Sequence, residues 1–179
     1  INILIHNRTI VCSPKSEVHS MMHINLIVLG KLKEKYWQDS EAEYLKRLSA
    51  WAKISINEIK EEAFTEKDPL EFIKQKEAEK IIHALTKFPG SFIIVLDEHG
   101  KQFSSVDFAK QINQLTNKQI NEVTFIIGGP LGLHESILAK ANLKLSLSAM
   151  TFTHQMARVF LSEQIYRAMT IILGKKYHY

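Results

Sequence analysis

The stretch VTFIIGGPLGLHES, Val123–Ser136, decides the fold of this chain. Its apolar, β-branched first half predicts a buried strand, and its last residues open a short helix predicted over Glu135–Ala141. The double glycine Gly128–Gly129 separates the two, and glycine lets backbone groups approach a ligand closely because it carries no Cβ. A further short strand, predicted over Leu143–Met150, follows at once. These turns together predict one ligand site.

The rest of the chain repeats this alternation of strand and helix. Each predicted strand is followed by a helical pattern, which predicts a single α/β domain with a mainly parallel sheet. Ligands of such sheets bind outside the carboxyl ends of the strands, where loops here begin at Leu96, Gly128 and Ser146. The predicted strands are His23–Leu29, Ile54–Ile59, Ser91–Gly100, Val123–Ile127 and Leu143–Met150.

Two helices carry predictions that a structure can check. In the second predicted helix of the chain, Asp68 is expected to be the cap, with Pro69 as the first helical residue and Phe72 on the inner side. The last helix, predicted over His154–Leu173, is apolar on more than one face. Burial on two sides is expected if it packs on its own sheet and on a second subunit.

Composition sets broad limits. The chain has 179 residues, 45% hydrophobic and 23% charged, which is typical of one globular domain. A net charge of +4 favours an anionic partner only weakly. The single Cys12 excludes an intrachain disulfide and a multi-cysteine metal site and indicates a reducing compartment. No apolar run is long enough to span a membrane. Residues 1–21 are interpreted as an N-terminal extension, and 22–179 as the domain.

Several common site chemistries do not fit. The GGPLG turn is not a GxGxxG fingerprint, and no Walker lysine follows it. Three scattered histidines, His99, His134 and His154, have no metal-ligand spacing. Ser136 and Ser148 lack the context of a nucleophile elbow. The residues alone predict a small-ligand site made largely of backbone, without metal and without a conventional acid–base set.

Motifs spread along residues 22–179 resemble those of the RlmH family. These are SAM-dependent methyltransferases of the SPOUT class, which modify N3 of a pseudouridine in large-subunit ribosomal RNA. The motifs, each weak alone but specific together, are VLGKLKEKYW (Val28–Trp37), EYLKRL (Glu43–Leu48), LDEHGK (Leu96–Lys101), IIGGPLGL (Ile126–Leu133), LSLSAMTFTHQMARVFLSEQIYRA (Leu145–Ala168), and the terminal pair Tyr177 and His178.

The resemblance implies a fold and a cofactor site. It implies a deep trefoil knot in the C-terminal half and a homodimer in which the partner completes each site. S-adenosylmethionine (SAM) is the implied cofactor, and glycine turns and apolar side chains suit such a ligand. The residues that match the family's cofactor positions are Leu96, Gly128, Gly129, Leu147, Ser148, Ala149, Met150, Thr151, Phe152 and Thr153.

The resemblance also implies roles for the last helix and the tail. His178, with Tyr177 beside it, is the candidate base that helps the acceptor lose its proton. Some basic residues are expected to contact RNA phosphates: Arg158, Arg167, Lys175 and Lys176, with Lys31, Lys33 and Lys35 as further candidates. The two arginines are alternatively expected to contact the second subunit.

Two positions depart from the family pattern. Thr153 stands where relatives commonly have proline, which is expected to loosen the cofactor loop. Tyr179 stands where a basic residue commonly ends the chain, which weakens the expected grip of the tail on phosphate, although an aromatic ring can stack on a base.

The functional expectation is a cytoplasmic, dimeric methyltransferase of large-subunit (23S) ribosomal RNA, acting on the assembled 70S ribosome. Two alternatives stay open. One is a non-catalytic RNA- or ribosome-binding protein that keeps the SPOUT fold. The other is a SPOUT methyltransferase acting on a different RNA.

Overall fold

The computed structural model describes residues 21–177. Of the predicted extension, residues 1–20 lie outside the described part, and so do His178 and Tyr179. Strands and helices alternate strictly along the described residues. They are β1 (Met22–Leu29), α1 (Lys35–Leu48), β2 (Ala52–Ile59), α2 (Leu70–Leu85), β3 (Phe92–Gln102), α3 (Ser105–Asn117), β4 (Glu122–Ile127), α4 (Glu135–Leu138), β5 (Leu143–Ser146) and α5 (His154–Ile172).

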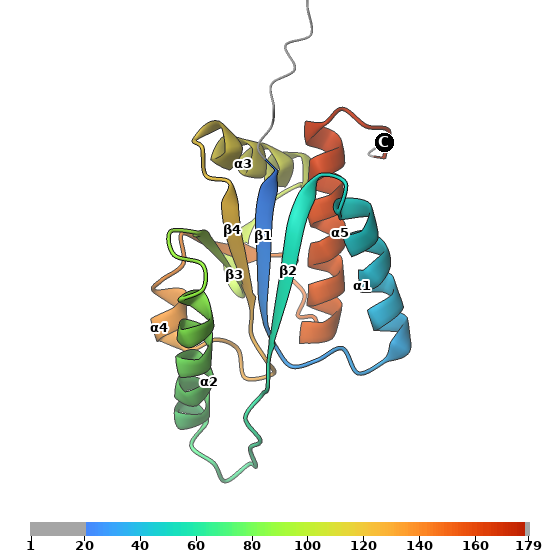
Figure 1. Cartoon of the computed structure of the whole chain (residues 1–179). Helices are drawn as coiled ribbons and strands as arrows, with labels where there is room; N and C mark the ends of the chain where they lie inside the picture. The colour runs from blue at the N-terminus through green and yellow to red at the C-terminus, as the bar shows by residue number, and fades with distance from the viewer. Residues whose placement is uncertain (1–20, 178–179) are drawn as a thin grey trace, which may run out of the picture.

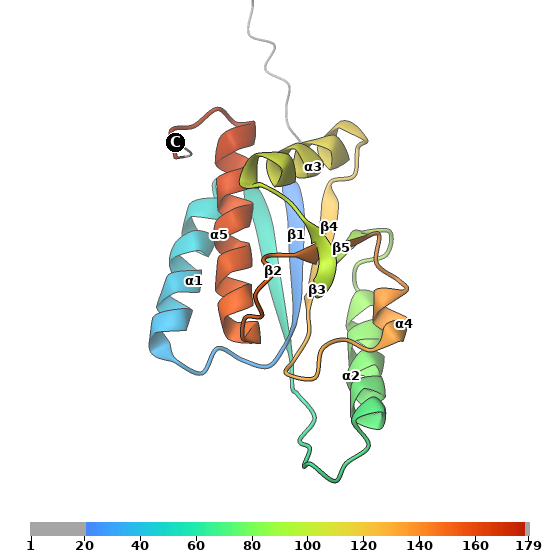
Figure 2. The same ribbon diagram turned by 180° about the vertical axis from the view of Figure 1, so that it is seen from behind.

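The strands form one five-stranded sheet in the order β2-β1-β4-β3-β5. Every neighbouring pair is parallel. Figures 1 and 2 show α1, α3 and α5 on one face of the sheet and α2 and α4 on the other. The predicted single α/β domain with a parallel sheet is confirmed, and the trefoil knot stays a prediction.

Side chains of β1 show why the sheet is covered on both faces. Ile24, Leu26 and Val28 belong to the core shared with α1, α3 and α5. Ile27 and Leu29 point the other way, into the core under α2 and α4. Alternate residues of a strand face opposite sides of the sheet, so this near-continuous apolar run buries both faces, as central parallel strands do.

Parallel strands bring all their carboxyl ends to one edge of the sheet. The chain leaves β4 at Gly128 and β5 beyond Ser146 at this edge, and α5 begins there (Figure 1). At about 1.5 Å per residue, the 19 residues of α5 carry the chain about 28 Å away from it. The end of α5, where the C-terminal tail starts, therefore lies at the opposite end of the molecule from the turns that follow β4 and β5.

Helix α2 departs from its predicted start. It begins at Leu70 with Pro69 in the cap position, and no side chain caps it. The carboxylate of Asp68 instead accepts hydrogen bonds from the backbone N–H and hydroxyl of Thr65, at 2.6 and 2.8 Å. Asp68 therefore closes the preceding turn, and the predicted cap is wrong. Phe72, predicted to face inward, is 52% exposed. It lies outside the row of buried residues of α2, which begins at Ile73 and continues at Glu77, Ile81 and Ala84.

Candidate active site

A cavity opens at the carboxyl edge of the sheet, between the ends of β3, β4 and β5 and the start of α5. Its volume is about 140 Å³, and its mouth is open to solvent. The lining residues are Leu96–Glu98 from β3, Ile127–Gly129, Gly132 and Leu133 after β4, Leu145–Ser148 and Met150–Phe152 from β5 and its loop, and His154 and Ala157 from α5.

This cavity brings together most of the residues expected to hold a cofactor. Leu96 and the pair Gly128–Gly129 line it, although they lie more than thirty residues apart in the sequence. From the loop after β5, only Ala149 and Thr153 of the expected set are absent from the lining. The three strand ends that the sequence selected thus converge on one cavity.

Hydroxyl groups hold the loop after β5 in place. The Ser146 hydroxyl donates to the carbonyl of Ser148 at 2.8 Å, and the Ser148 hydroxyl accepts from the N–H of Met150 at 2.9 Å. The Thr151 hydroxyl donates to Glu98 at 3.2 Å, which ties the loop to the end of β3. The loop therefore has a defined path beside the cavity, and its main chain can serve a ligand.

Thr153 replaces the family's proline with a helix cap. Its side chain accepts a hydrogen bond from the N–H of Met156 at 3.3 Å, in the first turn of α5. Its backbone φ of −62° is also the angle that a proline ring imposes. The start of α5 is thus fixed by a different device, and this geometry does not support the expected loosening of the turn.

We expect Thr153→Ala to lower the free energy of unfolding by about 1 kcal/mol, because an alanine leaves the N–H of Met156 without its cap. Thr153→Pro should cost less, because proline fits the observed φ and removes only the side-chain bond. Urea unfolding of both variants measures the difference. An alanine variant as stable as the wild type, or a proline variant that unfolds more easily than alanine, contradicts this assignment.

The polar groups of the cavity favour a ligand with positive charge. Asp97 and Glu98 add carboxylates to a lining that otherwise consists of apolar side chains, glycines, hydroxyl groups and the ring of His154. Among the lining residues, all within the described part of the chain, none is lysine or arginine. A phosphate-rich nucleotide would lack a cationic partner here, whereas a sulfonium or ammonium group would find one. Within residues 21–177, no group of His, Cys, Asp or Glu could hold a metal ion.

A model of the family described as "Predicted SPOUT methyltransferase" matches residues 22–178. The chain belongs to the SPOUT methyltransferase family. It is 45% identical over 162 residues to the "Ribosomal RNA large subunit methyltransferase H" of Pelotomaculum thermopropionicum, an alignment that covers 89% of this chain and 100% of the relative. The same name and identity hold for a relative from Clostridium acetobutylicum, over 88% of this chain and 99% of that one. The resemblance to the RlmH family is thereby confirmed.

Solved structures support the fold of this SPOUT methyltransferase. A probable methyltransferase from Bordetella pertussis Tohama I superposes with a TM-score of 0.53, over 83% of this chain and 95% of that one. Only 9% of the aligned residues are identical, so the likeness concerns the fold alone. Among the described residues, no helix of this SPOUT methyltransferase is both long and apolar enough to cross a membrane.

The tail of this SPOUT methyltransferase folds back on α5 up to Tyr177. The Tyr177 ring packs edge-on against Tyr166 with centroids 4.8 Å apart, and the Arg167 guanidinium lies 4.9 Å from its centroid. Its hydroxyl donates to Glu163 at 3.3 Å. Burial, with Tyr44 and Glu163 nearby, raises the pKa of Tyr177 to about 12. Near pH 7 Tyr177 is a neutral hydrogen-bond donor and not a base.

The arginines expected to contact RNA in this SPOUT methyltransferase are held by carboxylates. Arg158 is buried, with Nε and Nη2 at 2.5 and 2.7 Å from the two oxygens of Glu41, and Nη1 at 2.8 Å from Glu58. This geometry does not fit the expected RNA contact, because the guanidinium is committed inside the protomer. Arg167 pairs with Glu163 at 2.7 Å, whereas Lys175 and Lys176 are exposed.

Sequence reasoning overlooked three groups at the cavity. In the sequence, Asp97 and Glu98 stand out only as part of the motif LDEHGK, and His154 only as a scattered histidine without metal-ligand spacing. The ring of His134, another of these histidines, caps α4 by accepting from the N–H of Ser136. His154 instead is half-buried at the cavity wall. The missed signal is position, since polar residues that follow the apolar run of a parallel strand, or stand at the start of the next helix, face the ligand edge.

Proposed function

We propose that this SPOUT methyltransferase uses SAM to methylate large-subunit (23S) ribosomal RNA in the cytoplasm, at N3 of a pseudouridine on the assembled 70S ribosome. One observation carries the proposal. The chain is 45% identical, along nearly its whole described length, to relatives named as methyltransferases of this RNA. The cavity at the carboxyl edge of the sheet supports it, because its chemistry matches that cofactor.

SAM fits the lining in charge and in shape. Apolar side chains such as Leu96, Leu147 and Phe152 suit the faces of an adenine, and the glycine turn leaves main-chain groups accessible. The carboxylates of Asp97 and Glu98 suit the ammonium and sulfonium groups. When bound, SAM supplies an activated methyl group, and the protein has to align donor and acceptor. The proposed binding residues are Leu96, Gly128, Gly129 and Leu147–Thr153.

The acceptor nitrogen must lose its proton, and His178 is the proposed base, with Tyr177 beside it as a neutral donor. The preceding residue, Tyr177, packs on Tyr166 and bonds to Glu163, which lie 12 and 9 residues, or about 18 and 14 Å, along α5 from His154 at the cavity. A tail anchored there is too far away to serve the cavity of its own protomer. We therefore propose a homodimer in which each tail serves the cavity of the other subunit. Exposed apolar side chains on α3 and α5, Val106 and Phe160, suit such a contact.

The exposed pair Lys175–Lys176 leads into this tail and suits the phosphates of the RNA. Arg167 already pairs with Glu163 beside Tyr177, so its proposed role is to hold the tail next to the RNA. Contacts with phosphate release counterions, so binding to ribosomes is expected to weaken steeply as salt rises.

Calorimetric titration with SAM tests the cofactor assignment. The wild type should bind SAM, and Ala157→Phe should lose at least about tenfold in affinity, because Ala157 lines the cavity and a phenyl ring would fill it. The matched control is Ala139→Phe, at an exposed alanine after α4 that does not line the cavity. Thermal unfolding checks that both variants are folded. A folded wild type that does not bind SAM overturns the proposed function.

A further inference from the structure

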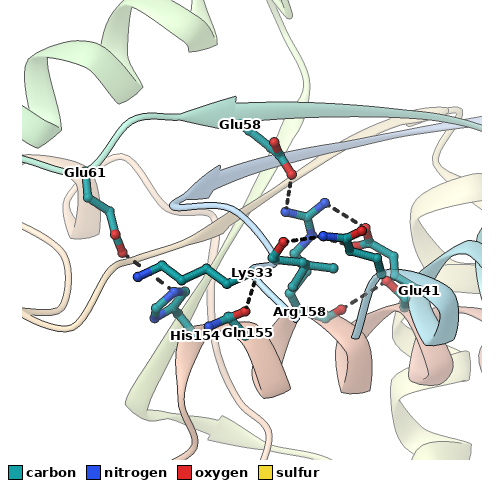
Figure 3. Close-up of polar contacts among 10 residues, drawn as sticks. Lys33, Glu41, Glu58, Glu61, His154, Gln155 and Arg158 are labelled. Carbon is teal, nitrogen blue, oxygen red and sulfur yellow. Dashed lines mark hydrogen bonds and ion pairs between the residues drawn. The ribbon is translucent and has the colours of Figure 1, made fainter. Parts of the chain in front are cut away.

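Two polar atoms beside the cavity have no hydrogen-bond partner within residues 21–177. They are Oε1 of Glu61 and Nε2 of His154, both buried. The two atoms face each other at 3.6 Å (Figure 3). A hydrogen bond between such groups measures about 2.7–3.2 Å, so the two groups lie within ion-pair distance but form no hydrogen bond. Buried polar groups are almost always satisfied, and two that face each other without bonding call for a physical reason.

The pair stands where three elements meet. Glu61 lies two residues after the end of β2, and His154 is the first residue of α5 and lines the cavity. Gly30, directly after β1, closes the space around them. A Cβ on Gly30 would lie 2.8 Å from Oε1 of Glu61 and 3.2 Å from Nε2 of His154. The pair therefore occupies a space that only a glycine leaves open.

One turn further along α5, the contact between the helix and the β2 side of the sheet is a full hydrogen bond. Arg158 lies four residues after His154, and its Nη1 donates to Glu58 of β2 at 2.8 Å. The second turn of α5 is thus bonded to the end of β2, and the first turn is not. Because the loop Leu147–Thr153 runs directly into this first turn, a small movement of the turn carries the loop with it.

Neighbouring cations do not satisfy Glu61. Lys80 is engaged by Glu62 at 2.5 Å and donates to the carbonyl of Lys60 at 2.9 Å. The N–H of Lys33 donates to Gln155 at 2.8 Å, and the Lys33 side chain lies beside the pair in Figure 3. Glu61 thus remains available to His154.

We propose that Glu61 and His154 are positioning residues that close the cavity around its cofactor. When the cavity is filled, the first turn of α5 moves toward the end of β2, the 3.6 Å separation shortens to a hydrogen bond, and the loop Leu147–Thr153 is fixed against the ligand. The inference rests on the proposed function, because SAM is the occupant. Glu61 acts through His154 and the loop.

A double-mutant cycle tests this pair with and without SAM. The variants are Glu61→Ala, Glu61→Gln, His154→Ala and the double alanine, with Glu62→Ala as the matched control, since Glu62 bonds to Lys80. We expect Glu61→Ala to weaken SAM binding about tenfold, the size typical of a hydrogen bond to a charged group. Glu61→Gln should recover part of this loss, because its amide still bonds to imidazole.

The cycle separates closing from static support. The double alanine variant should lose no more SAM affinity than the single variant with the larger loss. Such a result shows that the two residues act as one unit. In urea unfolding without SAM, the two substitutions should be additive. Unchanged SAM affinity in Glu61→Ala, or full coupling already present without SAM, overturns the inference while the proposed function stands. A wild type that fails to bind SAM overturns both. Should His154→Ala not fold, His154→Gln takes its place in the cycle.

Discussion

Arg158→Met should lower the free energy of unfolding by about 3–5 kcal/mol, the largest stability loss that we expect from a single substitution here. Arg158 and Glu41 are each only 5% exposed. The guanidinium binds both oxygens of Glu41 and one of Glu58. Removing it leaves the carboxylate of Glu41 buried without its cation, and that uncompensated charge causes most of the loss.

Urea unfolding of Arg158→Met measures this loss, and the double variant Glu41→Leu with Arg158→Met is its control. Replacing both members of a buried pair by apolar residues removes the unpaired charge, so the double variant should regain much of the stability. A loss below about 1 kcal/mol in Arg158→Met would show that the guanidinium is not structural. The role expected from the sequence, a contact between Arg158 and an RNA phosphate, would then again be the better explanation.

His178→Ala should reduce methyl transfer to ribosomes at least about 100-fold, the lower range for loss of a general base. SAM affinity should stay within about twofold, because the described residues that lead into the tail, up to Tyr177, do not line the cavity. His99→Ala is the matched control, since that histidine has a largely exposed side chain and does not line the cavity. Turnover by His178→Ala at the wild-type rate removes the tail from the mechanism.

Mixed dimers decide whether the tail acts across the subunits. A dimer of one Ala157→Phe subunit and one His178→Ala subunit contains one open cavity and one intact tail, on different chains. If the tail serves the other subunit, this dimer has one complete site and should regain up to about half of the wild-type activity. A tail that serves its own cavity gives no recovery in the same mixture.

The fold could be predicted because each strand repeats a local rule. β1 and β4 are continuous apolar runs, and such runs between helical patterns predict central parallel strands. The order of strands in the sheet could not be predicted, because β1 pairs with both β2 and β4 through contacts that span many residues. The start of α2 was predicted wrongly because Asp68 suits a helix cap and a tight turn equally well.

The candidate site was predicted in its main chain and missed in its side chains. Gly128 and Gly129 predict a close approach of the backbone to a ligand; both line the cavity, and their contact with a cofactor stays a prediction. Sequence alone could not show that Arg158 turns inward and pairs with Glu41. The sequence pattern around a helical arginine is the same whether its guanidinium binds an RNA phosphate or a buried carboxylate. Nor could sequence alone pair Glu61 with His154, which lie 93 positions apart and meet only because β2 ends and α5 begins at one edge of the sheet.

The most direct test of the central claim is a mass-spectrometric comparison of 23S ribosomal RNA from cells with and without this protein. The account predicts that one methylated pseudouridine is lost in the deletion strain. It also predicts that the wild-type protein with SAM restores the methyl group on ribosomes isolated from that strain, and that Ala157→Phe does not. Identical large-subunit RNA in the two strains, or a lost methyl group in transfer RNA instead, would contradict it.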